Sequence, residues 1–148
     1  MNQSSLFGSG RGGSATANID GGSRGNPGPA GYGVRIEQAD GTIVEIKQAI
    51  GSCTNNVAEY GALLAALRWA EEHGISSLRV RSDSELLVKQ MRGQYRVKNA
   101  GLQPLHEEAQ SRARRIGTVT FEHVRRELNK DADRLANEAM DEAAETSL

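Results

Sequence analysis

The order of apolar and polar positions predicts a chain that opens with strands and then alternates helices with strands. Residues 15–20, 32–38 and 42–50 have the alternation and the β-branched content of strands. A Gly/Pro-rich turn at 21–31 separates the first two, and the hairpin signal Asp40-Gly41 separates the second from the third. We therefore predict a three-stranded antiparallel meander at the start of the fold.

The rest of the chain predicts helices and strands in alternation. A long apolar helix should begin at a cap formed by Asn55 or Asn56 and end near Gly74, and Asn129 should cap the last helix. The elements between them are expected as a strand at 78–82, helices at 85–91 and 102–116, and a strand at 118–124. Because strand–helix–strand steps are crossovers, the first strand and these two should run parallel. The prediction is an α/β fold with a five-stranded mixed sheet flanked by helices, whose ligand binds beyond the carboxyl ends of the strands.

Length and composition predict one domain that folds in a reducing compartment. We expect residues 15–148 to form the domain and the Gly/Ser-rich residues 1–14 to form a flexible tail. The sequence has neither an apolar run of membrane-spanning length nor a signal-peptide pattern, so no membrane partner is expected. Cys53 is the only cysteine, which excludes an internal disulfide. We therefore predict a cytoplasmic location, and we expect a monomer.

The charge is small overall but unevenly placed. A net charge of −1 argues against a strongly basic nucleic-acid binder, yet 13 of the 18 basic residues lie between Arg79 and Arg134. Such a stretch suits a polyanionic ligand, although ordinary solvated helix faces explain it equally well. Charge alone therefore does not choose a function.

Four carboxylates stand where a role in surface charge explains them poorly. Asp20 ends the first strand, Asp83 follows the strand at 78–82, Glu59 lies early in an apolar helix, and Asp133 edges the apolar stripe of the last helix. Acidic residues are seldom buried unless they are paired or bind a metal, and clustered carboxylates repel one another unless cations are present. Hard divalent cations prefer oxygen ligands. The pattern predicts one metal site, with Mg²⁺ as the cation, assembled from distant parts of the chain.

Four motifs around these carboxylates closely resemble type 1 ribonuclease H. They are DGGSRGNPGPAG from Asp20 to Gly31, TNNVAE from Thr54 to Glu59, SDS from Ser82 to Ser84, and NKDADRLA from Asn129 to Ala136. The resemblance covers about residues 15–143. It implies a ribonuclease H-like fold that cuts the RNA strand of RNA/DNA hybrids with two Mg²⁺ ions, Mn²⁺ serving as a substitute, and with Asp20, Glu59, Asp83 and Asp133 as the metal ligands. Two-metal hydrolysis should leave a 5′-phosphate and a 3′-hydroxyl.

The resemblance also implies contacts to the hybrid. The implied residues are Asn26, Thr54, Asn55, Asn56 and Ser84. Simpler roles exist for them, since the Gly/Pro-rich turn sets backbone angles and Thr54, Asn55 or Asn56 can cap the helix. Two adjacent asparagines exceed what a cap needs, and contacts to the 2′-hydroxyl would distinguish RNA from DNA.

His123 and Arg126 offer two sources of catalytic assistance. Many members of the family have a loop histidine that assists product release, and His123 has the matching spacing from Asp133. His123 nevertheless continues the strand at 118–124, where alternation places it inward beside Phe121 as a packed side chain. Arg126, in the loop beyond, is therefore predicted to supply the cationic assistance.

The stretch that follows Asp83 departs from many relatives. They carry a basic handle there, whereas residues 91–105 hold only Arg92, Arg96 and Lys98 as basic residues. This resembles the compact branch of the family, and it predicts modest, salt-sensitive affinity for substrate.

Two alternative functions remain open. A nuclease of the same fold would act on double-stranded RNA or on a DNA junction, and the asparagine pair favours a reader of 2′-hydroxyls over a junction enzyme. A catalytically weak hybrid-binding module is the other alternative, and the presence of all four carboxylates argues against it.

Overall fold

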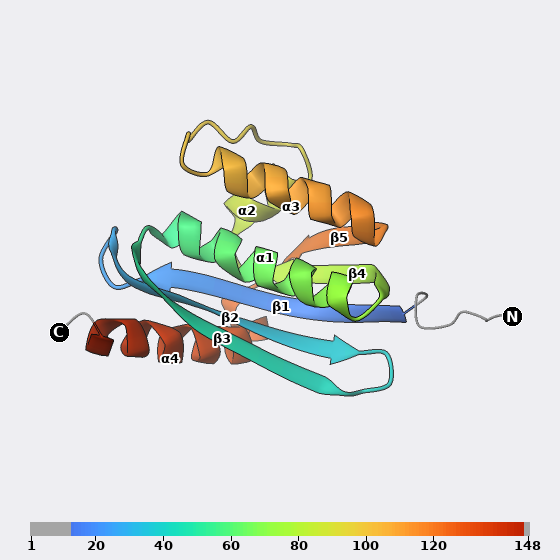
Figure 1. Ribbon diagram of the computed structural model, residues 1–148, viewed down its shortest axis with the longest axis horizontal. Helices are drawn as coiled ribbons and strands as arrows, with labels where there is room; N and C mark the ends of the chain where they lie inside the picture. The colour runs from blue at the N-terminus through green and yellow to red at the C-terminus, as the bar shows by residue number, and fades with distance from the viewer. Residues whose placement is uncertain (1–12, 147–148) are drawn as a thin grey trace, which may run out of the picture.

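The computed structural model describes residues 13–146, which form one mixed sheet with helices on both faces (Figure 1). The elements in chain order are β1 (Gly13–Ser23), β2 (Gly28–Gln38), β3 (Ile43–Cys53), α1 (Asn55–Glu72), β4 (Ile75–Ser82), α2 (Glu85–Met91), α3 (Gln103–Ile116), β5 (Thr118–His123), the 3₁₀ helix η2 (Arg126–Leu128) and α4 (Lys130–Thr146).

The five strands of this region are ordered β3-β2-β1-β4-β5. The first three pair antiparallel, while β1 and β4, and then β4 and β5, pair parallel. The predicted meander and the predicted parallel crossovers are both confirmed. This order puts β1 at the centre of the sheet and places the ends of β1, β4 and β5 along one edge.

The helices cover the two faces unequally. Figure 1 shows α1 and α3 on one face and α4 on the other. The α4 helix approaches β2 closely at two glycines: a Cβ added to Gly33 would lie 2.4 Å from the Leu135 Cβ, and one added to Gly31 would lie 2.5 Å from the Ala139 Cβ. Glycine in β2 therefore lets the helix that carries Asp133 lie directly on the sheet. None of the helices in this part of the chain has both the length and the apolar character needed to cross a membrane.

The first hairpin is longer than predicted. Gly21, Gly22 and Ser23 continue the ladder of β1 and pair with residues at the start of β2, so the expected turn at 21–31 shrinks to the four residues between the strands. Ladder hydrogen bonds outweigh the low strand propensity of glycine here. At the other end β1 begins at Gly13, two residues before the expected start, and the rest of the predicted tail lies outside the described residues.

Two predicted caps are used differently. The cap of α1 is Thr54, whose Oγ1 accepts a hydrogen bond from the Val57 N–H at 3.3 Å. The prediction of an Asn55 or Asn56 cap is therefore wrong. Asn129 does stand directly before α4, but its buried side chain accepts from Asn18 Nδ2 and donates to the Ile19 carbonyl on β1. It fastens the start of α4 to the central strand.

Candidate active site

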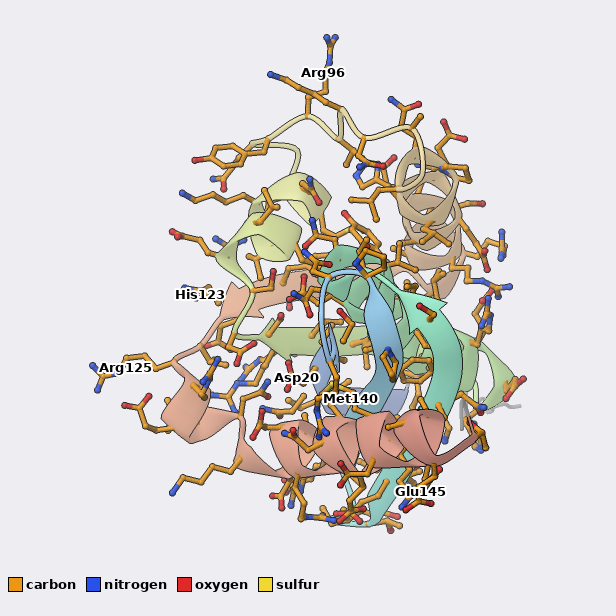
Figure 2. All side chains as sticks on the ribbon, turned by 90° about the vertical axis from the view of Figure 1, so that its left-hand side faces the viewer. Asp20, Arg96, His123, Arg125, Met140 and Glu145 are labelled. Atoms are coloured by element: carbon orange, nitrogen blue, oxygen red, sulfur yellow. The ribbon has the colours of Figure 1, made fainter. Side chains whose placement is uncertain are left out.

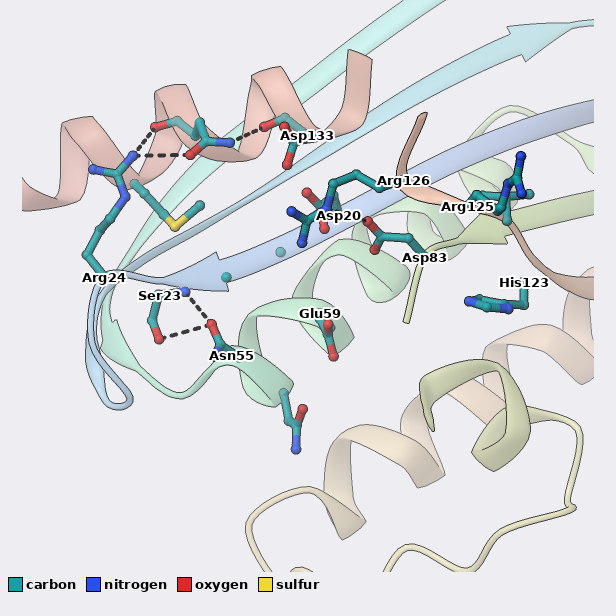
Figure 3. Close-up of a pocket in the computed structure, with 16 residues that line it drawn as sticks. Asp20, Ser23, Arg24, Asn55, Glu59, Asp83, His123, Arg125, Arg126 and Asp133 are labelled. Atoms are coloured by element: carbon teal, nitrogen blue, oxygen red, sulfur yellow. Dashed lines mark hydrogen bonds and ion pairs between the residues drawn. The ribbon is translucent and has the colours of Figure 1, made fainter. Parts of the chain in front are cut away.

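A pocket of about 780 Å³ opens at the sheet edge where β1, β4 and β5 end. All four predicted carboxylates line it, and Figure 3 shows them arranged around it. The other lining residues are Gly21, Gly22, Ser23, Arg24, Asn55, Asn56, His123, Val124, Arg125, Arg126, Asn137 and Met140.

The sequence brings the carboxylates together through local packing. Asp20 lies near the end of β1, and Asp83 directly follows the neighbouring parallel strand β4. A Cβ on Gly21 would lie 2.3 Å from the Ala58 carbonyl oxygen, so only glycine allows the first turn of α1 this close. That approach brings Glu59 beside the end of β1.

Burial and mutual repulsion raise the pKa values of these acids. Burial, the charge of Asp83 and a hydrogen bond with Asp133 together raise the pKa of Asp20 to about 8. Burial raises the pKa of Glu59 to about 7, against a hydrogen bond that it accepts from the Ser84 hydroxyl at 3.2 Å. Burial also raises the pKa of Asp83, and the nearby Arg126 guanidinium works in the opposite direction. The protein alone therefore disfavours the ionised form of these carboxylates, which a bound cation would favour.

The donor set fits hard divalent cations. Its atoms are carboxylate oxygens, the ligands that Mg²⁺ prefers. Within residues 13–146, no three His, Cys, Asp or Glu side chains are already gathered in a geometry ready to hold a metal ion. Like-charged carboxylates repel one another unless a cation lies between them, so a bound cation would draw these oxygens together.

His123 does not pack inward, so that prediction is wrong. It is the last residue of β5, it is exposed, and it lines the pocket, whereas Phe121 two residues earlier is buried. The alternation rule holds for Phe121. His123 is at the end of β5, where its side chain lies beyond the packed core. Figure 2 looks onto this edge, with Asp20 near the centre and His123 and Arg125 toward one side.

Arg126 lies where the sequence suggested a cationic group. It opens η2, its side chain is 83% exposed, and its Nε is 3.9 Å from Asp83 Oδ2. An exposed guanidinium at this distance contributes little to folding and is free to meet an anionic ligand.

The predicted hybrid contacts fall into two groups. Asn55 and Asn56 line the pocket, and Asn55 Oδ1 accepts from the Ser23 N–H at 2.8 Å. Asn26 is not among the lining residues, and its Oδ1 accepts a hydrogen bond from the Asn55 N–H at 3.0 Å. With both amide oxygens engaged by the main chain, the amide nitrogens are the ends available to donate to a ligand. Thr54 and Ser84 are helix caps, and Ser84 also orients Glu59.

Sequence reasoning missed several residues of the pocket wall. Arg24, Arg125, Asn137 and Met140 were not predicted as site residues. For Asn137 a signal existed, because it lies one helical turn after Asp133 and so shares its face of the last helix. Arg24 could be recognised only once α4 was seen to lie against the first hairpin.

Comparison with known proteins shows the family of the chain. A family model described as Reverse transcriptase-like matches residues 18–139. Ribonuclease HI of Halobacterium salinarum is 42% identical over 134 residues, which are 90% of this chain and 67% of that protein. The chain belongs to the ribonuclease H family. It is also 50% identical over 130 residues to the bifunctional protein Rv2228c of Mycobacterium tuberculosis, and the match covers 86% of this chain but 36% of that protein.

Solved structures confirm the predicted ribonuclease H fold. The N-terminal ribonuclease H domain of Rv2228c has a TM-score of 0.88 at 47% identity, covering 92% of this chain and 99% of that one. LC11-RNase H1, solved in complex with an RNA/DNA hybrid, has a TM-score of 0.82 at 41% identity. The match covers 88% of this chain and 99% of that one. The ribonuclease H domain is thus about a third of the length of Rv2228c, and the activity of any longer protein does not follow from it.

Proposed function

We propose that this chain is an endoribonuclease that hydrolyses the RNA strand of RNA/DNA hybrids by two-metal catalysis. The observation that carries the proposal is the meeting of Asp20, Glu59, Asp83 and Asp133 in one open pocket at the carboxyl edge of the sheet. Membership of the ribonuclease H family and the hybrid bound to LC11-RNase H1 support the substrate.

The four carboxylates would hold two Mg²⁺ ions, or Mn²⁺ in their place. When bound, the pair would supply an activated water and stabilisation of the leaving 3′-oxygen in an in-line displacement. Asp20 must release its proton for this, because its pKa of about 8 keeps it largely protonated at neutral pH without a cation. The expected products carry a 5′-phosphate and a 3′-hydroxyl.

Residues around the carboxylates would position the substrate. Asn55 and Asn56 would donate from their amide nitrogens to sugars in the minor groove, where the 2′-hydroxyl marks the RNA strand. Asn26 would donate to the nucleic-acid backbone, and Thr54 and Ser84 would touch the hybrid from the starts of α1 and α2. Arg126 would meet a substrate phosphate beside Asp83.

A substrate panel tests this function. End-labelled RNA/DNA hybrid, duplex RNA and duplex DNA are incubated with Mg²⁺, Mn²⁺ or EDTA. The proposal predicts metal-dependent cleavage of the hybrid's RNA strand, no cleavage of duplex DNA and no reaction in EDTA. Cleavage of duplex RNA in preference to hybrid would move the assignment to a double-stranded RNA nuclease. Hybrid binding without cleavage in either metal would identify a binding module.

A further inference from the structure

Arg24 lines the pocket and is held there by contacts with the last helix. It lies at the tip of the first hairpin, where its main-chain N–H donates to the Pro29 carbonyl at 2.8 Å. Its Nη1 pairs with Asp141 at 2.9 Å, and its Nη2 lies 3.3 Å from Asn137 Oδ1 and 3.4 Å from the Asn137 carbonyl. These contacts hold the partly exposed guanidinium at the pocket wall.

The cations of the pocket stand on opposite sides of its carboxylates. Figure 3 shows Arg24 at one end and Arg125 at the other, with Arg126 beside Asp20 and Asp83 between them. A nucleic-acid strand that places one phosphate over the carboxylates would place a neighbouring phosphate toward each end. Phosphate contacts supply much of the affinity of such complexes and fix the register of the strand.

We propose that Arg24 binds the phosphodiester next to the scissile one on the substrate strand and releases Asp141 to do so. The inference rests on the proposed function and adds to it a substrate-binding residue at the end of the pocket away from Arg125. A guanidinium matches the geometry of phosphate oxygens. The pair with Asp141 is exposed, at 44% and 62% of the two side chains, so replacing this carboxylate with a phosphate costs little.

Asn137 keeps Arg24 beside α4 when a phosphate replaces Asp141 as the partner of the guanidinium. Its Nδ2 donates to the Asp133 carbonyl at 2.9 Å, while its Oδ1 and carbonyl face Arg24. Arg24 therefore keeps a contact with α4 when Asp141 is released, and it stays beside the turn that carries Asp133. The exchange alters an ion pair at the rim without moving the carboxylates.

Two substitutions separate substrate binding from a purely structural latch. Arg24→Ala removes the phosphate contact and the ion pair, whereas Asp141→Asn removes only the competitor for Arg24. A substrate-binding role predicts opposite effects, with weaker hybrid binding for Arg24→Ala and tighter binding for Asp141→Asn. A latch predicts the same effect for both, a matched loss of thermal stability and of activity. Arg134→Ala is the control, because Arg134 is equally exposed on α4 but pairs with Glu45 and Glu138.

The experiment measures binding of a fluorescein-labelled RNA/DNA hybrid by anisotropy in EDTA over a salt series, and then KM and kcat with Mg²⁺. Arg24→Ala should weaken binding about tenfold and lower the slope of log K against log salt by about one. For Arg24→Ala, KM should rise with kcat nearly unchanged. Asp141→Asn should lower both the dissociation constant and KM. Arg134→Ala should match the parent in both. Parent-like binding by folded Arg24→Ala, or parallel losses in Arg24→Ala and Asp141→Asn, would overturn the proposal. A parent that neither binds nor cuts hybrid would instead overturn the proposed function.

Discussion

Asp20 is the residue at which burial and like charge act together most strongly. Its pKa of about 8, against 3.8 for an ordinary aspartate, means that the folded protein binds a proton which the unfolded chain releases at much lower pH. Between these values the folded state holds more protons than the unfolded state, so stability falls as pH rises. The raised pKa of Glu59 acts in the same direction.

The metal-free protein should therefore become less stable as pH rises from about 4 to about 8. Bound Mg²⁺ compensates the charge, so its stabilising effect should be largest at the upper end of this range, where Asp20 is deprotonated. Thermal melts in EDTA and in Mg²⁺ over a pH series measure both effects, and Asp20→Asn should flatten the dependence. Equal stabilisation by Mg²⁺ at both ends would show that Asp20 does not bind the ion.

Thr54 and Asn56 are neighbours with separable roles. Thr54→Ala removes the cap of α1 and should cost about 1 kcal/mol of stability, because the Val57 N–H loses its acceptor. Asn56 is exposed at the pocket, so Asn56→Ala should change stability by less than about 0.5 kcal/mol while slowing hybrid cleavage. Chemical denaturation and steady-state cleavage distinguish the two. Parent-rate cleavage by Asn56→Ala would remove it from the substrate contacts.

At the scale of elements, α1 and α3 are joined by an ion-pair network. Glu71 on α1 bonds to Arg112 and Arg115 on α3, and only 22% of its side chain is exposed. Burial would raise the pKa of Glu71, but the hydrogen bonds from the two arginines outweigh burial and lower it. The network fixes the outer helix to the helix that carries Glu59.

Glu71→Gln should lower the free energy of unfolding by roughly 1–2 kcal/mol, because two arginines lose a partly buried partner. Turnover per folded molecule should stay at the parent value, since the network is remote from the pocket residues. Denaturation by urea together with kcat measures the two properties. Glu72→Gln is the matched control, an exposed glutamate at the next position, and a loss of stability as large as that of Glu71→Gln would refute the network's role.

The elements themselves were largely predictable from the sequence, and their ends were not. The short helix at 85–91 has its predicted bounds, because Ser84 is a strong local cap. The first hairpin was predicted too short. Gly21 and Gly22 are typical turn residues, and only their ladder pairing with β2 shows that they belong to the strand. The side chain of Asn129 has a long-range role, through bonds to β1 that no local pattern contains.

At the scale of the whole molecule, the candidate site also has a part that local sequence patterns predict and a part that depends on long-range packing. The four carboxylates were predictable, because each stands at the end or edge of an element and in a recognisable motif. Arg24 was not, since its position depends on where α4 lies against the hairpin. His123 had a signal in its spacing from Asp133, but strand alternation predicted an inward side chain, and that failed at the end of β5. Local patterns identify the four clustered acids, and packing between distant elements determines the residues around them.

The sheet order brings the candidate site together at one edge of the described sheet. It gathers acids from β1, α1, the end of β4 and α4, and it places arginines on either side of them. A net charge of −1 is compatible with a polyanionic substrate because cations stand where the strand would cross. The central claim is that these carboxylates form a metal-dependent nuclease site.

The most direct test compares Asp83→Asn with Asp131→Asn on end-labelled RNA/DNA hybrid in Mg²⁺. Asp83→Asn removes a charge from the pocket with little change in volume, whereas Asp131 is 55% exposed and pairs with Arg35 and Arg134 outside it. The account predicts that Asp83→Asn folds, is at least as stable as the parent without metal, and cuts no hybrid, while Asp131→Asn cuts at the parent rate. Substantial Mg²⁺-dependent cleavage by folded Asp83→Asn would contradict it.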